Sequence, residues 1–174
     1  MTPNPTRLRR NGFTLLEVLV ALLVLSIGLL GIGKLMVLSS RANGSAYLRS
    51  QATALAYSVF DDIRGNRTLA LVGPPYAYAV AIGANPGNVA CPAPPTGCNS
   101  AQQAQNDLAN WKAALTAALP NGDGSVVITT ANDPVTGVVN VTAAVTVQWN
   151  DSVAQQVLGG PAGGNDTVTL ETIL

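Results

Sequence analysis

An almost unbroken apolar run near the start of the chain most limits what this sequence can fold into. Residues 18–33 carry no charge, and after Lys34 residues 35–38 are apolar again. About 20 apolar residues in a row are enough to cross a bilayer as a helix. Arg7, Arg9 and Arg10 precede the run, and a basic start followed by an apolar segment is typical of an export signal. We therefore expect this segment to enter a membrane.

The small residue expected at a cleavage site lies before the apolar run. A secretory signal would carry an Ala-x-Ala-like site after the run, and residues 35–45 offer no convincing one, whereas Gly12 lies before the run. Cleavage between Gly12 and Phe13 would leave a free amine on Phe13. Glu17 would then lie one helical turn away, about 6 Å along the axis. Because a charge near a bilayer costs free energy, Glu17 is expected to have a function.

These residues resemble a known signal. The heptapeptide Gly-Phe-Thr-Leu-Leu-Glu-Val at 12–18 resembles the class III signal of type IV pilins and of type II secretion pseudopilins. Residues 20–31, with Arg-Ser-Gln-Ala at 49–52 and Asp-Ile-Arg-Gly-Asn-Arg at 62–67, are similar to the minor pilin family PilV, the type IV pilus modification protein. The resemblance covers about residues 10–67. The rest of the chain adds little to it.

The resemblance implies a sequence of events. A prepilin peptidase would cut after Gly12 and N-methylate Phe13. Glu17 would pair with the terminal amine of a neighbouring subunit. The leader would stay on the cytoplasmic side, in agreement with the positive-inside rule. The expected partners are other minor pilins and the major pilin, contacted through the N-terminal helix, together with the peptidase and the inner membrane.

The function implied is that of a minor type IV pilin that helps to prime or assemble pili for twitching motility and adhesion. It would reside in the inner membrane with its globular part in the periplasm, and later in the pilus at the cell surface. Three other interpretations stay open. They are a minor pseudopilin of a type II secretion system, an adhesive or DNA-uptake tip subunit, and a single-pass anchored periplasmic domain, which predicts no cleavage at Gly12.

A long helix is expected from Phe13 to about Arg67. No proline lies between Thr6 and Gly73, and an apolar stripe recurs at helical spacing further along. The stripe comprises Ala52, Leu55, Ala56, Val59, Phe60 and Ile63. Three glycines, Gly28, Gly31 and Gly33, interrupt the apolar half. They would allow either close packing of membrane helices or local loosening when the subunit leaves the bilayer, whereas Asn43-Gly44-Ser45 is expected to stay helical.

The pattern predicts an α+β chain with the type IV pilin fold, in four segments. These are a cleaved basic leader (1–12), a transmembrane and filament-core half of the helix (13–38), an amphipathic half (39–72) and a periplasmic globular head (73–174). Gly73-Pro74-Pro75 should end the long helix. The head should hold a short strand at 76–82, a loop at 83–99, a second helix from a Ser100 cap to Leu119, and strands at 125–131, 139–150 and 167–173. Residues 159–166 should form a turn, and the sheet should lie antiparallel on the amphipathic half.

Two cysteines, Cys91 and Cys98, lie in the Pro- and Gly-rich loop. After an export or membrane segment, such a pair predicts a disulfide in an oxidising compartment. The chain contains no histidine, the commonest general base, and we expect no enzyme, no cofactor and no metal. The Asn-Gly-Asp-Gly run at 121–124 is interpreted as a turn because it lacks EF-hand spacing. From residue 72 onward the chain has one lysine and six acids, so no nucleic acid is expected as a partner.

Overall fold

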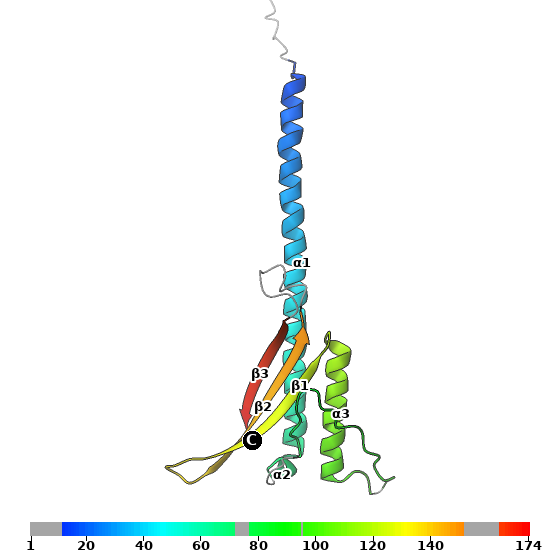
Figure 1. The fold of residues 1–174 in the computed structure, drawn as a ribbon, viewed down its shortest axis with the longest axis vertical. Coiled ribbons are helices and arrows are strands. Elements are labelled where there is room, and N and C mark those ends of the chain that lie inside the picture. The colour runs from blue at the N-terminus through cyan, green and yellow to red at the C-terminus, as the bar shows by residue number, and fades with distance from the viewer. Residues whose placement is uncertain (1–11, 72–76, 95, 152–163) are drawn as a thin grey trace, which may run out of the picture. The chain divides into compact units, whose positions relative to one another are not determined.

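The computed structural model describes residues 12–71, 77–94, 96–151 and 164–174 (Figure 1). Its contacts divide the chain into two units, residues 1–40 and 41–174, and each is described by itself. Helix α1, Leu15–Gly65, begins in the first unit and ends in the second. The predicted α+β class is confirmed by this long helix, a small antiparallel sheet and a further helix.

The first unit is the apolar part of α1. Every described side chain in residues 12–40 is exposed, including a dense series of leucines and valines. By length and composition, α1 alone among the described helices is long and apolar enough to cross a membrane. The helix continues unbroken through Gly28, Gly31 and Gly33, and also through Asn43-Gly44-Ser45 as predicted. Such a surface needs lipid or other apolar helices around it.

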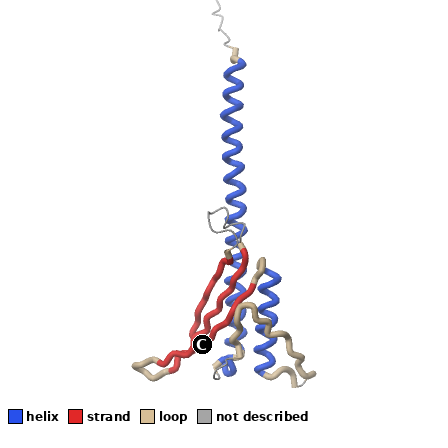
Figure 2. Tube along the Cα trace, in the orientation of Figure 1, coloured by secondary structure: helices blue, strands red, loops and turns tan. Residues whose placement is uncertain are grey.

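The second unit combines the rest of α1 with two helices and a sheet. Helix α2 is Arg67–Ala70 and α3 is Ser100–Ala118. Strands β1 (Asp123–Asn132), β2 (Val139–Asn150) and β3 (Asn165–Ile173) pair antiparallel in the order β1-β2-β3 (Figure 2). Each strand is thus hydrogen-bonded to the strand that comes next to it in the sequence.

The core of the second unit forms between one face of the sheet, α1 and α3. The predicted stripe of α1 is buried, with Leu55 half-buried. Strand β2 alternates as predicted, and the inward residues Val141, Ala143, Val145, Val147 and Trp149 are buried. The predicted α3 stripe of Leu108, Trp111, Leu115 and Leu119 joins the same cluster. Burying each large apolar side chain stabilises the fold by about 1.5–3 kcal/mol.

The long helix is slightly shorter than predicted at both ends. It begins at Leu15 rather than Phe13 and ends at Gly65 rather than near Arg67. Asn66 leaves the helical conformation, with φ −119° and ψ 39°, and its Nδ2 donates to the carbonyl of Ser100 at 2.8 Å. This tertiary hydrogen bond favours a break at Asn66, after which α2 begins. The predicted terminator at 73–75 lies outside the described residues.

The predicted Ser100 cap of α3 is wrong, because Asn99 is the N-cap. The Asn99 Oδ1 accepts from the backbone N–H of Gln102 at 2.9 Å, and Gln102 Oε1 accepts from the Asn99 N–H at 3.0 Å. This reciprocal pair satisfies two N–H groups that a helix start leaves free. Ser100 is therefore the first helical residue, and Leu119, predicted as the last, is an extended C-cap.

The strand predicted at 76–82 is also wrong. In the described part of this segment only Val80 pairs with the sheet, through two hydrogen bonds to Val126 of 3.0 and 2.9 Å. Tyr78 is buried in the core, whereas Ile82 is 45% exposed. Gly83 then adopts a left-handed φ of 77°, which turns the chain away from the sheet. Tyr76 lies outside the described residues.

Two strand boundaries differ from the prediction. Strand β1 begins at Asp123 and ends at Asn132, longer than the predicted 125–131. Asn165 and Asp166 belong to β3 rather than to a turn, because they pair with Asn150 and Trp149 of β2. Residues 159–163 of the predicted turn lie outside the described residues. The polar side chains of Asn165 and Asp166 suggest a turn in the sequence. Their pairing with β2 places them in the strand.

Candidate functional site: the start of the apolar helix

The predicted cleavage residues lie just before the helix. Gly12, Phe13 and Thr14 lie outside the helix, and α1 begins at Leu15. The Thr14 carbonyl accepts from the N–H of Glu17 at 3.1 Å and of Val18 at 3.3 Å. The Thr14 Oγ1 also accepts from the Glu17 N–H, at 3.3 Å. Thr14 therefore caps the helix.

The role of Thr14 was missed from the sequence. The pattern Thr14-x-x-Glu17 directly before an apolar run is a recognised start signal for helices. In the structure the Thr14 half of this pattern is formed, since its hydroxyl bonds to the N–H of the third helical residue. The capping pattern could thus have placed the helix start at Leu15 from the sequence alone.

Glu17 lies in the first turn of α1. A carboxylate there is favoured by the positive end of the helix dipole. No ion pair joins Glu17 to another described residue, since the described ion pairs are Arg64–Asp61 and Lys112–Asp123. Phe13 is 84% exposed and shares with Glu17 a shallow groove whose other walls are Val18, Ala21, Leu22 and Leu25. The carboxylate is thus set among apolar side chains.

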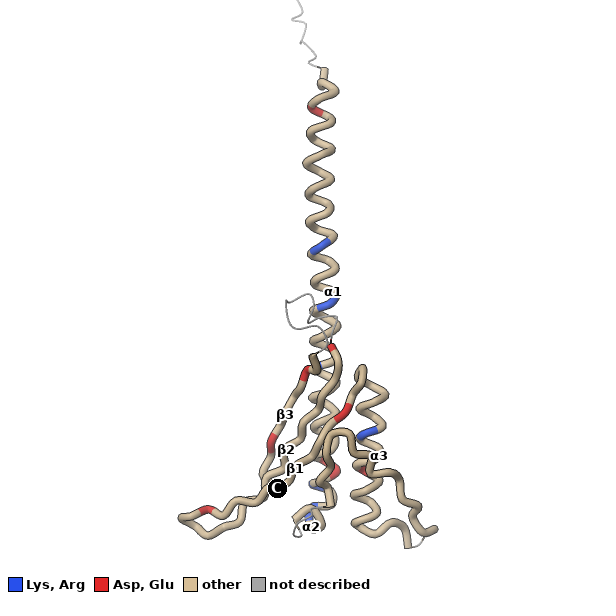
Figure 3. The backbone as a smooth tube through the Cα atoms, in the orientation of Figure 1, with Lys and Arg blue, Asp and Glu red and all other residues tan. Residues whose placement is uncertain are grey.

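Charge is sparse on this part of the helix (Figure 3). Between Glu17 and Lys34 no residue is charged. The three glycines Gly28, Gly31 and Gly33 lie in the same stretch, and a Cβ built on any of them would meet nothing within 4 Å. Their small size is therefore not required by packing inside the described chain. It is available for contacts with lipid or with other helices.

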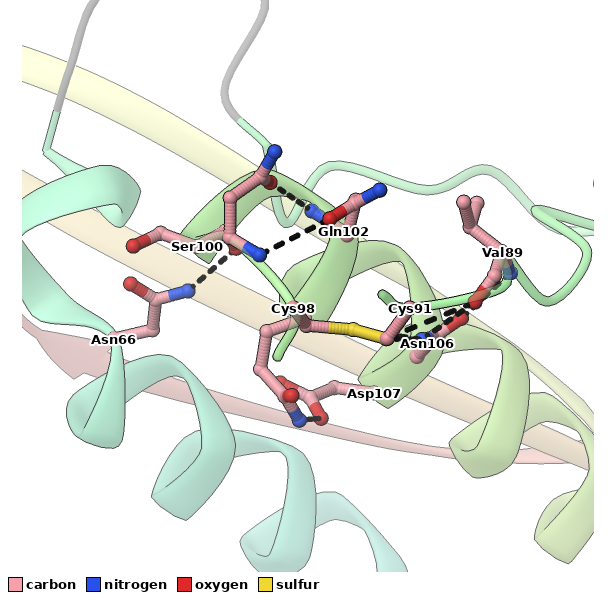
Figure 4. The surroundings of a disulfide bond; sticks show 10 residues. Asn66, Val89, Cys91, Cys98, Ser100, Gln102, Asn106 and Asp107 are labelled. Carbon is pink, nitrogen blue, oxygen red and sulfur yellow. Dashed lines mark hydrogen bonds between the residues drawn. A yellow bond between two sulfur atoms is a disulfide. The ribbon is translucent and has the colours of Figure 1, made fainter. Parts of the chain in front are cut away.

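The loop of the second unit contains the predicted disulfide, which is confirmed (Figure 4). Cys91 and Cys98 are joined, with their Cα atoms 4.7 Å apart. Asn106 of α3 holds this loop by accepting from the Val89 N–H at 2.7 Å and donating to the Val89 carbonyl at 3.0 Å. Its Nδ2 also lies 3.4 Å from Cys91 Sγ and 3.6 Å from Cys98 Sγ. The disulfide loop is thus fixed against α3.

A cluster of polar side chains lies between α1 and α3. The Tyr78 hydroxyl donates to Asp107 Oδ2 at 2.8 Å, and burial together with this carboxylate raises the pKa of Tyr78. Burial, and then repulsion from Asp107 and Asp61, raises the pKa of Asp62. Gln103 Nε2 donates to the other oxygen of Asp107 at 2.6 Å. Among the described residues no group of three His, Cys, Asp or Glu side chains could hold a metal ion.

Comparison with known proteins identifies the first of these regions. The prokaryotic N-terminal methylation motif matches residues 7–33. The match includes Gly12, Phe13 and Glu17 and extends through the three glycines. No curated protein and no solved structure matches the chain. The comparison therefore informs only on residues 7–33. The sheet and α3 are interpreted from their geometry alone.

Proposed function

We propose that this chain, which carries the methylation motif of prepilin-processed, type IV pilin-like proteins, is a minor type IV pilin. Such proteins are structural subunits. The finer assignment, a PilV-like minor pilin that helps to prime or assemble pili, rests on the resemblance of residues 20–31, 49–52 and 62–67. The chain would act by packing with other subunits.

The observation that carries the proposal is the position of Glu17. It lies in the first turn of a helix whose apolar side chains are exposed over the whole first unit, and it falls within the matched motif. An isolated carboxylate among apolar side chains is costly in a low dielectric unless a cation pairs with it. Cleavage before Phe13 would create such a cation on each subunit.

The mechanism we propose has three steps. The apolar part of α1 holds the precursor in the inner membrane, with the basic leader on the cytoplasmic side. Prepilin peptidase then cleaves the Gly12–Phe13 bond and methylates the new amine of Phe13. Finally, Glu17 pairs with the amine of a neighbouring subunit as the apolar helices associate. The pairing would set the axial register between subunits and carry the chain from the membrane into the pilus.

The same motif suits a minor pseudopilin of a type II secretion system, so the machine must be identified in the cell. Deletion of the gene should abolish twitching motility and leave exoprotein secretion intact if the chain is a pilin. The reverse result would assign it to secretion. Both results are compatible with the proposed steps of cleavage and pairing, because the pilus and the secretion system share these steps.

Mass spectrometry of the mature N-terminus tests the proposal directly. The protein is purified from its native membrane or from sheared filaments, and the terminal peptide is sequenced. We expect it to start at Phe13 with one added methyl group on the amine. A mature polypeptide that starts at Met1 would refute the proposal, because no cation would then form beside Glu17 of the next subunit.

A further inference from the structure

We propose that Thr14 is a positioning residue for leader removal, because its cap keeps the Gly12–Phe13 peptide bond outside the helix. The inference rests on the proposed function, since it concerns the bond that the peptidase would cut. It assigns a role to a residue that the proposed steps of cleavage, methylation and pairing do not include.

The hydrogen bonds at the start of α1 carry the inference. The carbonyl that accepts the first hydrogen bonds of α1 is that of Thr14. It accepts from the N–H groups of Glu17 and Val18. The hydroxyl oxygen of Thr14 also accepts a hydrogen bond from the Glu17 N–H, at 3.3 Å. Within the described residues no hydrogen bond reaches the carbonyl of Gly12. The scissile bond is thus in non-helical backbone, two residues before the first helical residue.

Hydrolysis needs that carbonyl to be accessible. Water adds its oxygen to the Gly12 carbonyl carbon, the C–N bond to Phe13 breaks, and the proton goes to the Phe13 nitrogen. In a helix that began one turn earlier, the Gly12 carbonyl would accept from the Leu16 N–H. The carbonyl would then be shielded, and the backbone could not extend in the active site of a peptidase. Proteolytic cleavage is favoured in exposed chain that is not held in secondary structure.

Loss of the cap should therefore slow leader removal. A Thr N-cap is preferred over Ala by about 1 kcal/mol, a factor of about five in the equilibrium between helix starts. In Thr14→Ala the helix loses its preference for starting at Leu15. Earlier starts that include Phe13 and Gly12 gain population. Because this ratio limits how far the cleavable start can be depopulated, we expect the initial rate of leader release to fall by up to about fivefold.

The test uses the full-length precursor in detergent micelles with purified prepilin peptidase. The initial rate of release of the twelve-residue leader is measured for the wild type, Thr14→Ala, Thr14→Ser and Thr14→Asn. Serine retains the hydroxyl, and asparagine caps through a carbonyl oxygen without a hydroxyl. Ser26→Ala is the matched control, because Ser26 lies in the same helix and its hydroxyl donates to the Leu23 carbonyl, at 2.8 Å. Backbone chemical shifts of residues 12–16 report the helix start in each variant.

The expected result is slow cleavage of Thr14→Ala together with an earlier helix start, and near wild-type rates for Thr14→Ser, Thr14→Asn and Ser26→Ala. Wild-type cleavage of Thr14→Ala would overturn the inference. Rescue by serine without rescue by asparagine would also overturn it, since the peptidase would then recognise the hydroxyl itself. Failure of the wild type to be cleaved at Gly12–Phe13 would instead refute the proposed function, so the two failures are distinguishable.

Discussion

Lys112 Nζ lies 2.5 Å from Asp123 Oδ1, and this ion pair joins α3 to the first residue of β1. Lys112 also donates to the Ala81 carbonyl at 2.9 Å, while Asp123 accepts from the Gly83 N–H at 2.6 Å. The pair therefore also fixes the segment that follows Val80. Burial would raise the pKa of Asp123, but the bonds from Lys112, Gly83 and Gly124 outweigh it and lower the pKa.

We predict that this carboxylate makes stability fall in acid. Because its pKa is lowered in the folded chain, the unfolded chain binds the proton first as the pH falls. The contribution is complete above the ordinary aspartate value of 3.8 and is lost as the pH falls through the lower folded value. Asp123→Asn should cost about 1.5–3 kcal/mol at pH 7 and flatten the acid limb of the stability curve. Urea unfolding between pH 2 and 7 measures both, and an unchanged acid limb would contradict the assignment.

Gly124→Ala should destabilise the second unit by about 1–3 kcal/mol. A Cβ at Gly124 would lie 2.6 Å from Trp111 Cη2 and 2.8 Å from the Thr146 carbonyl oxygen, where neither ring nor backbone can easily move. Gly44→Ala is the control, since its Cβ would meet nothing within 4 Å in α1. That variant should instead be slightly more stable, by about 0.5–1 kcal/mol. Shifts of the denaturant midpoint in the same direction for both variants would contradict this packing.

Replacing Cys91 and Cys98 together by serine should lower the free energy of unfolding by about 2.5 kcal/mol, the loop-closure value for so short a loop. Asn106 should keep the loop near α3, because its two hydrogen bonds to Val89 do not involve sulfur. Asn106→Ala in the disulfide-bonded chain is the companion variant, and it should free the loop without breaking the disulfide. Thiol alkylation with mass analysis gives the redox state, and denaturant unfolding gives the energies.

Glu17→Ala should leave membrane insertion and leader removal intact and reduce incorporation into filaments. The reason is that the mutant lacks the partner for the Phe13 amine, while the apolar helix is unchanged. Glu17→Gln is the matched polar control and should fail similarly, because it keeps the shape and loses the charge. Immunoblots of sheared filaments and of membranes measure the two pools. Wild-type incorporation of either variant would remove the pairing role.

Replacing Gly28, Gly31 and Gly33 together by alanine, combined with a filament map, tests the two interpretations of these residues. Each substitution should favour the helix by about 1 kcal/mol, and none meets a neighbour within this chain. If the stretch must loosen in the filament, incorporation should fall while membrane insertion stays normal. A filament map with an unbroken helix through residues 27–34 would rule out loosening and leave close packing as the reason for the glycines.

Elements with a simple apolar period were predictable. The α1 stripe, the α3 stripe and the alternation of β2 each follow from spacing alone, because one face of each element had to be buried. The N-terminal methylation motif, which includes Gly12, Phe13 and Glu17, was recognisable for a similar reason, since it is a local pattern. Misplaced boundaries came from polar residues with several possible roles. Asn99 and Ser100 are both capping types, and only the bond to Gln102 distinguishes them.

The sequence by itself determined the two long helices, the strands of strong period, the disulfide pair and the signal before the apolar run, because each depends on residues that are neighbours along the chain. The tertiary structure decided how far the elements extend and what Lys112, Asn66 and Tyr78 do. Their partners are Asp123, Ser100 and Asp107. Those contacts join distant segments, and their free energy exists only once the chain has folded.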